Sequence, residues 1–392
     1  MKMTTLKLIS VASLFLALAT PAFSQGSLTP PGAPAPTMKS LDQIEARTIV
    51  NATNTPGDAQ NAFIISQPGS YYLTGNITGP AGKHGISIRA NDVTLDLNGF
   101  ELISGGGAGV RGIDVPSAQT GFHVLNGAIR GWSGGGLRAD AATTLAEKLM
   151  ATANVGGTGL AVGNGSLIRD CVATGNVTGI FAPDRTQVIN CISTVNSGDG
   201  FVCTSYVTIV DCTASRNDRS GIIADDYCNI IRCSASRNVS TQIIPTSGFG
   251  IEAKSGSNVV DCTASANGLD GIRVWFQSSV RGCTSRGNSA AGISAINQCR
   301  VTDNTCGANA RGIEIDGNGN RVEGNTCSAN SGTGILSNSS NGSIVRNLII
   351  RNDASDNGTN FDVGSANAVG PIVDVSAGGV IATSSPWANF VH

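Results

Sequence analysis

Residues whose types could do chemistry gather in the middle of the chain, between positions 225 and 316. They are carboxylates, two cations and aromatic side chains, separated by short apolar stretches. The set is Asp225, Asp226, Tyr227, Glu252, Lys254, Arg273, Trp275, Phe276, Glu314 and Asp316. A sugar chain is bound by aromatic platforms together with a few well-placed polar groups. The mixture therefore indicates a carbohydrate site, provided that the fold brings these residues onto one surface.

Eleven cysteines are the second candidate for chemistry. Six of them recur in one phase of a repeated pattern: Cys171, Cys191, Cys212, Cys233, Cys262 and Cys283. An odd number of cysteines cannot pair fully within one chain. A disulfide framework, an array of metal ligands and plain packing all have to be weighed for these thiols.

The spacing of glycines shows what positions both groups of residues. A Gly followed by an apolar residue recurs from Gly85 to Gly334, mostly in steps of 20–22 residues with a few longer ones. Between Gly159 and Gly271, a cysteine follows the Gly by twelve positions, and an asparagine follows the cysteine by five. The chain therefore repeats one structural unit many times.

The composition decides what that unit is. Gly, Asn, Thr and Val are abundant, which disfavours helical repeats, and the leucines of a leucine-rich repeat are missing. Short runs of alternating apolar residues end at Asn, Asp or Gly, which predicts three short strands per turn. We expect an all-β fold: one parallel β-helix of about twelve coils over residues 60–365, with a cap at each end.

The repeat resembles that of the right-handed parallel β-helix proteins, a family that includes pectate-lyase-like enzymes. The resemblance rests on the pattern "G-[I/F/L]…V-x-x-[C/N]-x-[A/S]…N" and on "VTLDLNGFEL" (Val93–Leu102), and it covers roughly residues 60–365. In pectate-lyase-like enzymes the strand that follows the repeat Gly carries the substrate cleft. Positions two and four after each Gly point outward from that strand, so the central polar residues fall on this face.

Two catalytic alternatives follow, and both stay open. The resemblance implies a uronate lyase in which Arg273 or Lys254 removes the proton alpha to the carboxylate. Asp225, Asp226 and Glu252 would then hold calcium. Alternatively, Asp225 and Glu252 stand one coil apart, near the carboxylate separation of about 5 Å used by retaining glycoside hydrolases. The motifs typical of polygalacturonases, Gly-His-Gly and Arg-x-Lys, are missing.

The stacked coils favour packing as the role of the cysteines. Neighbouring coils lie about 4.8 Å apart and keep their side chains parallel, which is poor geometry for a disulfide. Zinc needs four ligands that converge, whereas these thiols form a line. Later coils carry Asn304, Asn325 and Asn347 at the matching position, so the slot accepts a small polar side chain or a thiol. We also expect the second asparagine column, from Asn176 to Asn288, to form an amide ladder.

The ends of the chain carry other signals. Lys2 and Lys7 flank an apolar run that ends at "AFS", which predicts a signal peptide over residues 1–24 and a secreted or periplasmic location. Residues 25–59 are a Pro-rich leader and a cap, with a short amphipathic helix from Leu41 to about Arg47. Residues 366–392 form the C-terminal cap. No stretch is long enough to be a transmembrane segment of the mature chain.

Charge and composition exclude some partners. The formal net charge of −2 becomes −4 once the two lysines of the signal are removed, which argues against nucleic acid. Four methionines and three histidines argue against copper handling. We expect a protein that binds an extracellular polysaccharide on the outward face of its central coils, with lyase activity as the catalytic form. The rival is a non-catalytic scaffold, which a flat face without a groove walled by Thr241–Phe249 would favour.

Overall fold

The computed structural model describes residues 45–240, 247–337, 346–378 and 380–392. These residues contain 42 strands and no helix. The chain divides into two units, residues 1–46 and residues 47–392, and the second unit holds all the strands. Among the described residues there is accordingly no helix that could cross a bilayer.

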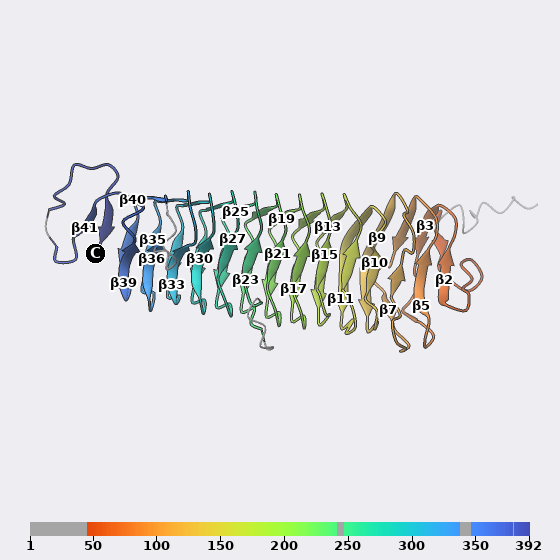
Figure 1. Cartoon of the computed structure of the whole chain (residues 1–392). Helices are drawn as coiled ribbons and strands as arrows, with labels where there is room; N and C mark the ends of the chain where they lie inside the picture. Colours follow the sequence, from red (N-terminus) through yellow and green to blue (C-terminus); the bar gives the residue numbers. More distant parts are fainter. Residues whose placement is uncertain (1–44, 241–246, 338–345, 379) are drawn as a thin grey trace, which may run out of the picture. The chain divides into compact units, whose positions relative to one another are not determined.

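The second unit is a parallel β-solenoid (Figure 1). One sheet, here called sheet B, contributes one strand per turn, and all of its neighbours pair in parallel. Its strands are β2 (Asn61–Ile65), β5 (His84–Ile88), β8 (Ile113–Asp114), β10 (Leu137–Ala139), β12 (Leu160–Val162), β15 (Ile180–Ala182), β18 (Phe201–Cys203), β21 (Ile222–Ala224), β24 (Ile251–Ala253), β27 (Ile272–Val274), β30 (Ala291–Ala295), β33 (Arg311–Ile315), β36 (Thr333–Ser337) and β39 (Thr359–Val363).

The solenoid has about 14 turns, so the expectation of about twelve coils is corrected. The difference lies in the first and last turns. Register places Ala62 beside Gly85 and Asn360 beside Gly334, so both end turns lack the glycine that marks the repeat. A count based on that glycine cannot find them.

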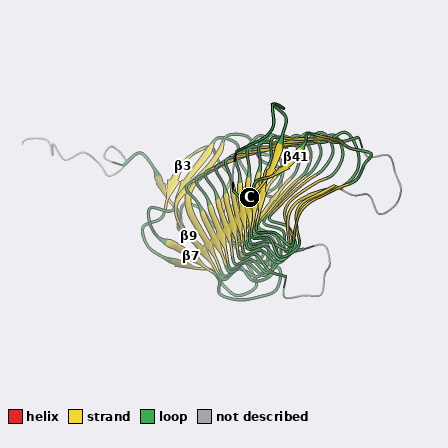
Figure 2. Ribbon diagram, turned by 90° about the vertical axis from the view of Figure 1, so that its left-hand side faces the viewer, coloured by secondary structure: helices red, strands yellow, loops and turns green. Residues whose placement is uncertain are grey.

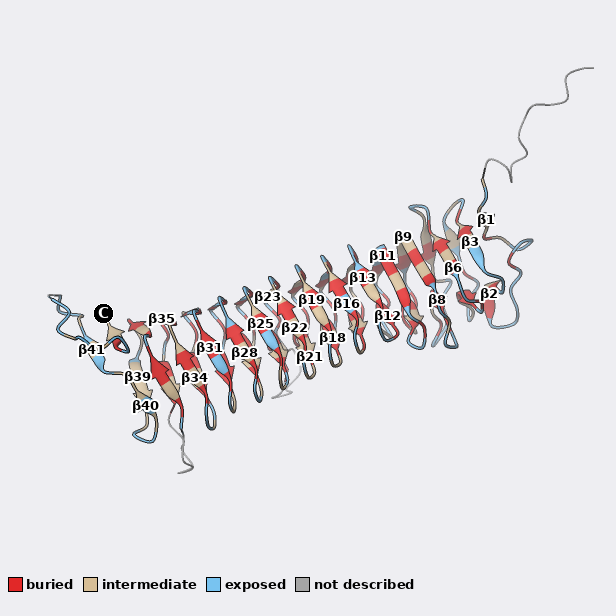
Figure 3. Ribbon diagram, turned by 90° about the horizontal axis from the view of Figure 1, so that it is seen from above, coloured by how far each residue is buried: buried red, intermediate tan, exposed pale blue. Residues whose placement is uncertain are grey.

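A middle turn shows why the repeat folds this way. Strand β21 is followed by β22 (Asn229–Ile231) and β23 (Ser234–Ser236), which stack in the second sheet, sheet A. Apolar side chains such as Ile222 and Ile230 point inward and are fully buried. Residues with positive φ, including Tyr227 (60°) and Arg232 (51°), turn the chain between strands. Stacking such turns gives the columns of strands in Figure 2 and the alternation of buried and exposed positions in Figure 3.

An asparagine ladder confirms the predicted amide column. Ten side chains are linked, each Nδ2 donating to the Oδ1 of the next at 2.7–3.2 Å. The members are Asn154, Asn176, Asn196, Asn217, Asn238, Asn267, Asn288, Asn309, Asn330 and Asn357. All but the last are buried, and because each amide satisfies its neighbours, the ladder holds successive turns in register.

The cysteines pack as predicted: all eleven are free and buried. The backbone N–H of Cys191 points at Cys212 Sγ (3.4 Å), whereas the N–H of Cys283 donates to Asn304 Oδ1 (2.8 Å). The cysteine thiol and the asparagine amide therefore occupy one slot, that is, the same position of the repeat in different turns. The slot continues through Asn325 to Asn352, and not to Asn347 as predicted, because that step between turns is 27 residues long.

The N-terminal helical cap is corrected as far as the structure allows. Residues 41–44 lie outside the described residues, as do the signal peptide and the Pro-rich leader. Residues 45–47 are not helical, and β1 (Thr48–Ile49) starts the solenoid by pairing with β3 (Gly69–Tyr72). The β-branched side chains of Thr48 and Ile49 suit a strand better than a helix. At the other end, β42 (Asn389–Val391) pairs with β38 (Asp353–Ser355) of the last regular turn.

Candidate functional site

The predicted site residues lie along one surface of sheet B and the corner that follows its strands, which together we call the central face. It comprises Asp225, Asp226, Tyr227, Glu252, Lys254, Asp270, Arg273, Trp275, Phe276, Arg311, Glu314 and Asp316. Register places Glu252, Arg273, Ser294 and Glu314 in one column on successive turns. A second column lies beside it and contains Asp225, Lys254, Trp275, Ile296 and Asp316. The backbone N–H of each of the last four residues donates to a carbonyl oxygen of the preceding turn.

Lys254 and Asp225 form an ion pair at the start of this surface. Lys254 Nζ lies 2.7 Å from Asp225 Oδ1, and both side chains are at least a third exposed. The hydrogen bond to Asp225 raises the pKa of Lys254 above its usual value. A lysine with a raised pKa is protonated at neutral pH and cannot accept a proton. This geometry weighs against Lys254 as the base predicted from the resemblance.

Trp275 is the best-positioned aromatic residue of the central face. Its Nε1 donates to Glu252 Oε1 (3.2 Å), which fixes the indole ring against the neighbouring turn. Arg273 Cζ lies 5.1 Å from the centroid of that ring and 5.4 Å from the ring of buried Phe249. Both distances suit cation–π contacts. Arg273 Nε is buried without a hydrogen-bond partner among the described residues, so this guanidinium retains an unused donor.

Aromatic residues also line the corner that follows the strands. The rings of Tyr206 and Tyr227 stack with centroids 5.2 Å apart and an angle of 12° between them. Arg185 Cζ lies 5.7 Å from the Tyr206 ring, which extends the stack by one turn. Tyr227 and Phe276 are about half exposed. Tyr206 and Arg185 were not among the predicted site residues, although both precede Tyr227 by whole repeats.

Two acidic residues of the central face have raised pKa values. Burial raises the pKa of Asp270, whose Oδ1 accepts the N–H of Ala291 (2.9 Å). Burial also raises the pKa of Glu314, although Arg311 pairs with it at 3.0 Å. Asp270 and Arg311 were not among the predicted site residues. Both stand immediately before a repeat Gly, a position that a count starting from the Gly leaves out.

The residues of the predicted calcium site and hydrolase pair make other contacts in the structure. Asp225 is paired with Lys254, Asp226 Oδ1 accepts the N–H of Ser255 (3.0 Å), and Glu252 is bonded to Trp275. No group of three or more His, Cys, Asp or Glu side chains with metal-binding geometry occurs in the described part of the chain. Register also sets Glu252 beside Ile223 rather than beside Asp225. Calcium binding stays a prediction.

The predicted groove wall falls largely outside the described residues. Of Thr241–Phe249, the structure describes only residues 247–249. Hollows of about 400–590 Å³ lie instead over sheet A, on β28 (Ser279–Arg281), β31 (Arg300–Thr302), β34 (Arg321–Glu323) and β37 (Leu348–Ile350). None of these three hollows is lined by a residue of the central face.

Two family models match parts of the chain. The model of the right handed beta helix region matches residues 112–289. The model of the periplasmic copper-binding protein (NosD) matches residues 228–368. That second segment contains no His and no Met, and its cysteines are buried. We therefore transfer no copper site to this chain.

Several solved structures are similar to the solenoid. The periplasmic alginate epimerase AlgG is 12% identical with a TM-score of 0.41, covering 87% of this chain and 80% of that one. The mannuronan C-5 epimerase AlgE4 A-module of Azotobacter vinelandii is 15% identical with a TM-score of 0.45, covering 76% and 90%. Pectate lyase Pel9A is 16% identical with a TM-score of 0.33, covering 79% and 70%. No match was found among curated protein sequences. Likeness at this level transfers no site residue.

Proposed function

This chain is a right-handed parallel β-helix protein, and we propose that it binds an extracellular polysaccharide on its central face. The observation that carries the proposal is the Glu252–Trp275–Arg273 group. A partly exposed indole is held by a hydrogen bond on one side and a guanidinium on the other. A rigid aromatic ring flanked by polar groups is the usual platform for a sugar ring.

Charge on the central face narrows the kind of polysaccharide. Its residues include six carboxylates against three cations, Lys254, Arg273 and Arg311, which gives a formal charge of −3. A surface with excess negative charge repels a polyanion at low ionic strength. A neutral polysaccharide therefore suits this surface better than a polyuronate.

Catalysis is the less supported extension of the proposal. Lys254 is held protonated by Asp225, and a guanidinium group such as that of Arg273 offers donors and no acceptor. A uronate lyase would require one of the two as a base. If glycosidic bonds are cleaved instead, Glu314 and Asp270 are the better acids, because their raised pKa values favour the proton-carrying form.

The N-terminal sequence supports a proposal for the location. Lys2, Lys7 and the apolar run before Gln25 support export by a cleaved signal. We propose a periplasmic or secreted protein, where a polysaccharide ligand would be available. A non-catalytic scaffold remains the alternative, and it predicts no saccharide binding at all.

A screen of binding and turnover tests the proposal. The purified chain is incubated with acidic and neutral polysaccharides, with calcium and with chelator, and affinity, unsaturated uronate and reducing ends are followed. We expect saturable binding of a neutral polysaccharide that Trp275→Ala weakens, with Val202→Ala, at a more distant strand of the same sheet, as the control. Unsaturated product that disappears in Arg273→Ala would establish a lyase instead. Failure to bind any polysaccharide would refute the proposal and favour the scaffold.

A further inference from the structure

A row of arginines crosses sheet A near the C-terminal end of the solenoid. The side chains are Arg281 on β28, Arg300 on β31, Arg321 on β34 and Arg351 just after β37. They line one hollow of about 590 Å³ together with Glu323 and Asp303. Four cations against two carboxylates give this surface, which we call the arginine groove, a formal charge of +2.

Pairing within the groove is incomplete. Glu323 bonds to Arg321 (2.6 Å) and to Arg351 (3.2 Å), so one carboxylate serves two arginines. Arg281 and Arg300 are exposed and have no side-chain partner among the described residues. Arg300 also stands directly beside Arg321 in register, one strand spacing of about 4.8 Å away. Like charges placed opposite each other in a sheet are destabilising, so this arrangement costs stability.

The repeat shows that the fold does not require these arginines. In three earlier turns the slot of Arg300 and Arg321 holds Thr208, Asn229 and Asn258. The slot of Arg281 holds Val210, Ile231 and Val260 in the same turns. The strands stack equally well with neutral side chains at these positions. Folding therefore does not explain why arginines occupy them in the groove.

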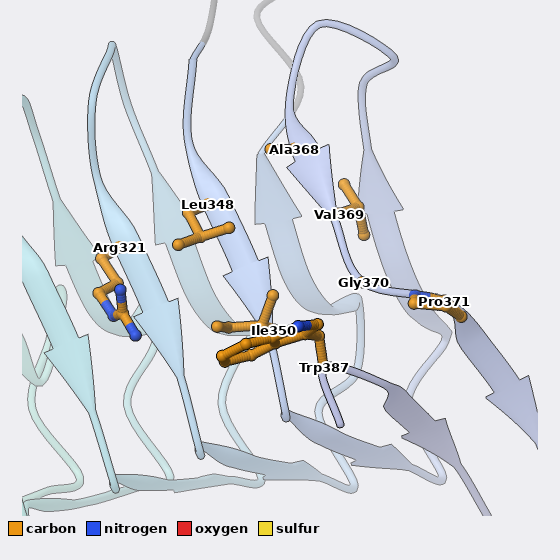
Figure 4. A pocket seen from close by; sticks show the side chains of 8 residues that line it. All are labelled: Arg321, Leu348, Ile350, Ala368, Val369, Gly370, Pro371 and Trp387. Carbon is orange, nitrogen blue, oxygen red and sulfur yellow. The ribbon is translucent and has the colours of Figure 1, made fainter. Parts of the chain in front are cut away.

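The ends of the groove add groups that suit a sugar chain. Arg321 also lines a neighbouring hollow of about 500 Å³ with Leu348, Ile350 and Trp387 (Figure 4). Trp387 is 47% exposed, and Arg351 Cζ lies 4.5 Å from the centroid of its ring. At the other end, Arg281, Arg300 and Thr302 line a hollow shared with Gln277 and Gln298. The three hollows share lining residues and follow one another across successive turns, and we call them together the track.

We infer that the arginine groove binds an acidic polysaccharide, one whose carboxylates repeat along an extended chain. Guanidinium groups bind carboxylates through paired, charge-assisted hydrogen bonds, and the exposed indole offers a platform for a sugar ring. A nucleic acid fits less well, because single strands are bound by rows of aromatic side chains and this track has one. The choice of a saccharide as the ligand rests on the proposed function. The positive charge of the groove and its unpaired arginines are observed independently of that function.

Titration of the full chain with polygalacturonate at low and high salt tests the inference. The variant Arg281→Gln/Arg300→Gln removes the two unpaired cations from the groove. The matched control, Arg216→Gln/Arg237→Gln, removes two exposed arginines from adjacent turns elsewhere. We expect the groove variant to bind at least about tenfold more weakly at low salt and the control to bind as the unmodified chain does. Equal binding by both variants, or equal weakening in both, would overturn the inference.

Two further probes keep the groove and the central face apart. Fully methyl-esterified polygalacturonate lacks the carboxylates, and we expect the groove variant to bind it no differently from the unmodified chain. A single-stranded oligonucleotide that binds as tightly as polygalacturonate, and is lost in the groove variant, would refute the saccharide assignment. Trp275→Ala is titrated in parallel: loss of neutral binding there, with acidic binding intact, supports both surfaces independently. Loss of acidic binding in Trp275→Ala alone would place the acidic ligand on the central face and overturn the groove.

Discussion

The central face and the arginine groove are made by the same repeat on two different sheets, yet they handle charge in opposite ways. On the central face, Asp225 is the partner of Lys254, Glu314 is the partner of Arg311, and Glu252 bonds to Trp275. In the groove, Arg281 and Arg300 have none among the described residues, and Arg300 stands beside Arg321. Where the charged side chains are paired with each other, the aromatic rings are left to bind a ligand. Where charged side chains are unpaired, their charge is available to the ligand. In a solenoid this contrast is easy to see, because the same position of the repeat can be compared between turns.

Disrupting the shared scaffold is expected to give the largest effect. Asn217→Ala removes the side chain that links Asn196 to Asn238 and leaves buried polar groups without partners. We expect a loss of about 3 kcal/mol in the free energy of unfolding, measured by urea denaturation. Asn318→Ala, at an exposed position, is the control. Since both surfaces depend on the ladder, an unchanged stability in Asn217→Ala would contradict the common scaffold.

Removing the aromatic platform should separate the two surfaces. We expect Trp275→Ala to weaken binding of a neutral polysaccharide about tenfold, or about 1.4 kcal/mol, because the ring contact and its hydrogen bond to Glu252 are both lost. Binding of polygalacturonate should stay within experimental error. Calorimetric titration of both ligands measures the difference. Equal losses for the two ligands would mean that one surface binds both.

The ion pair of the central face should matter little. Lys254→Met removes an exposed partner of Asp225, and exposed pairs contribute less than about 1 kcal/mol. We expect small changes in stability and no loss of any product formation, since a protonated lysine is no base. Kinetic and unfolding measurements on Lys254→Met and Lys254→Arg check this. A variant in which product formation stops, while Lys254→Arg retains it, would restore a role for the cation.

The smallest expected effect is a dependence of stability on pH. The pKa of Asp270 is raised in the folded state, so its contribution to stability is complete below the usual aspartate pKa and is lost as pH rises through the folded value. Asp270→Asn keeps an oxygen for the N–H of Ala291 and removes this dependence. Unfolding measured from pH 3 to pH 7 should therefore show a smaller decline in the variant. A larger decline in the variant would reverse the sign of the argument.

Much of the fold could be predicted because the repeat depends on a few residue types that few others can replace. The glycine before each strand and the buried asparagines recur at fixed spacing, so the strands and the ladder follow directly. The two end turns were not predicted because Ala62 and Asn360 stand where the other turns have the glycine that marks the repeat. The slot of Asn352 was misassigned because a longer turn shifted the count.

The candidate site was only partly predictable, for a different reason. Strand alternation placed Glu252, Arg273 and Trp275 on one surface, and register confirms that Glu252 and Arg273 are neighbours. Alternation says nothing of which side chains pair, so the bond between Lys254 and Asp225 could not be foreseen. Alternation also gives no information at the corners, where Tyr206 has a positive φ, or just before the glycine, where Asp270 and Arg311 stand. The arginine groove lies on sheet A, whereas the predicted site residues lie on sheet B.

Intrinsic fluorescence offers the most direct test of the central face, because the chain has three tryptophans in three different settings. Trp132 is fully buried, Trp275 belongs to the central face and Trp387 ends the arginine groove. The chain and its variants Trp275→Phe and Trp387→Phe are titrated with a panel of neutral oligosaccharides. The account predicts a saturable change in emission that Trp387→Phe retains and Trp275→Phe loses. A change that persists in Trp275→Phe, or no change with any member of the panel, would contradict it.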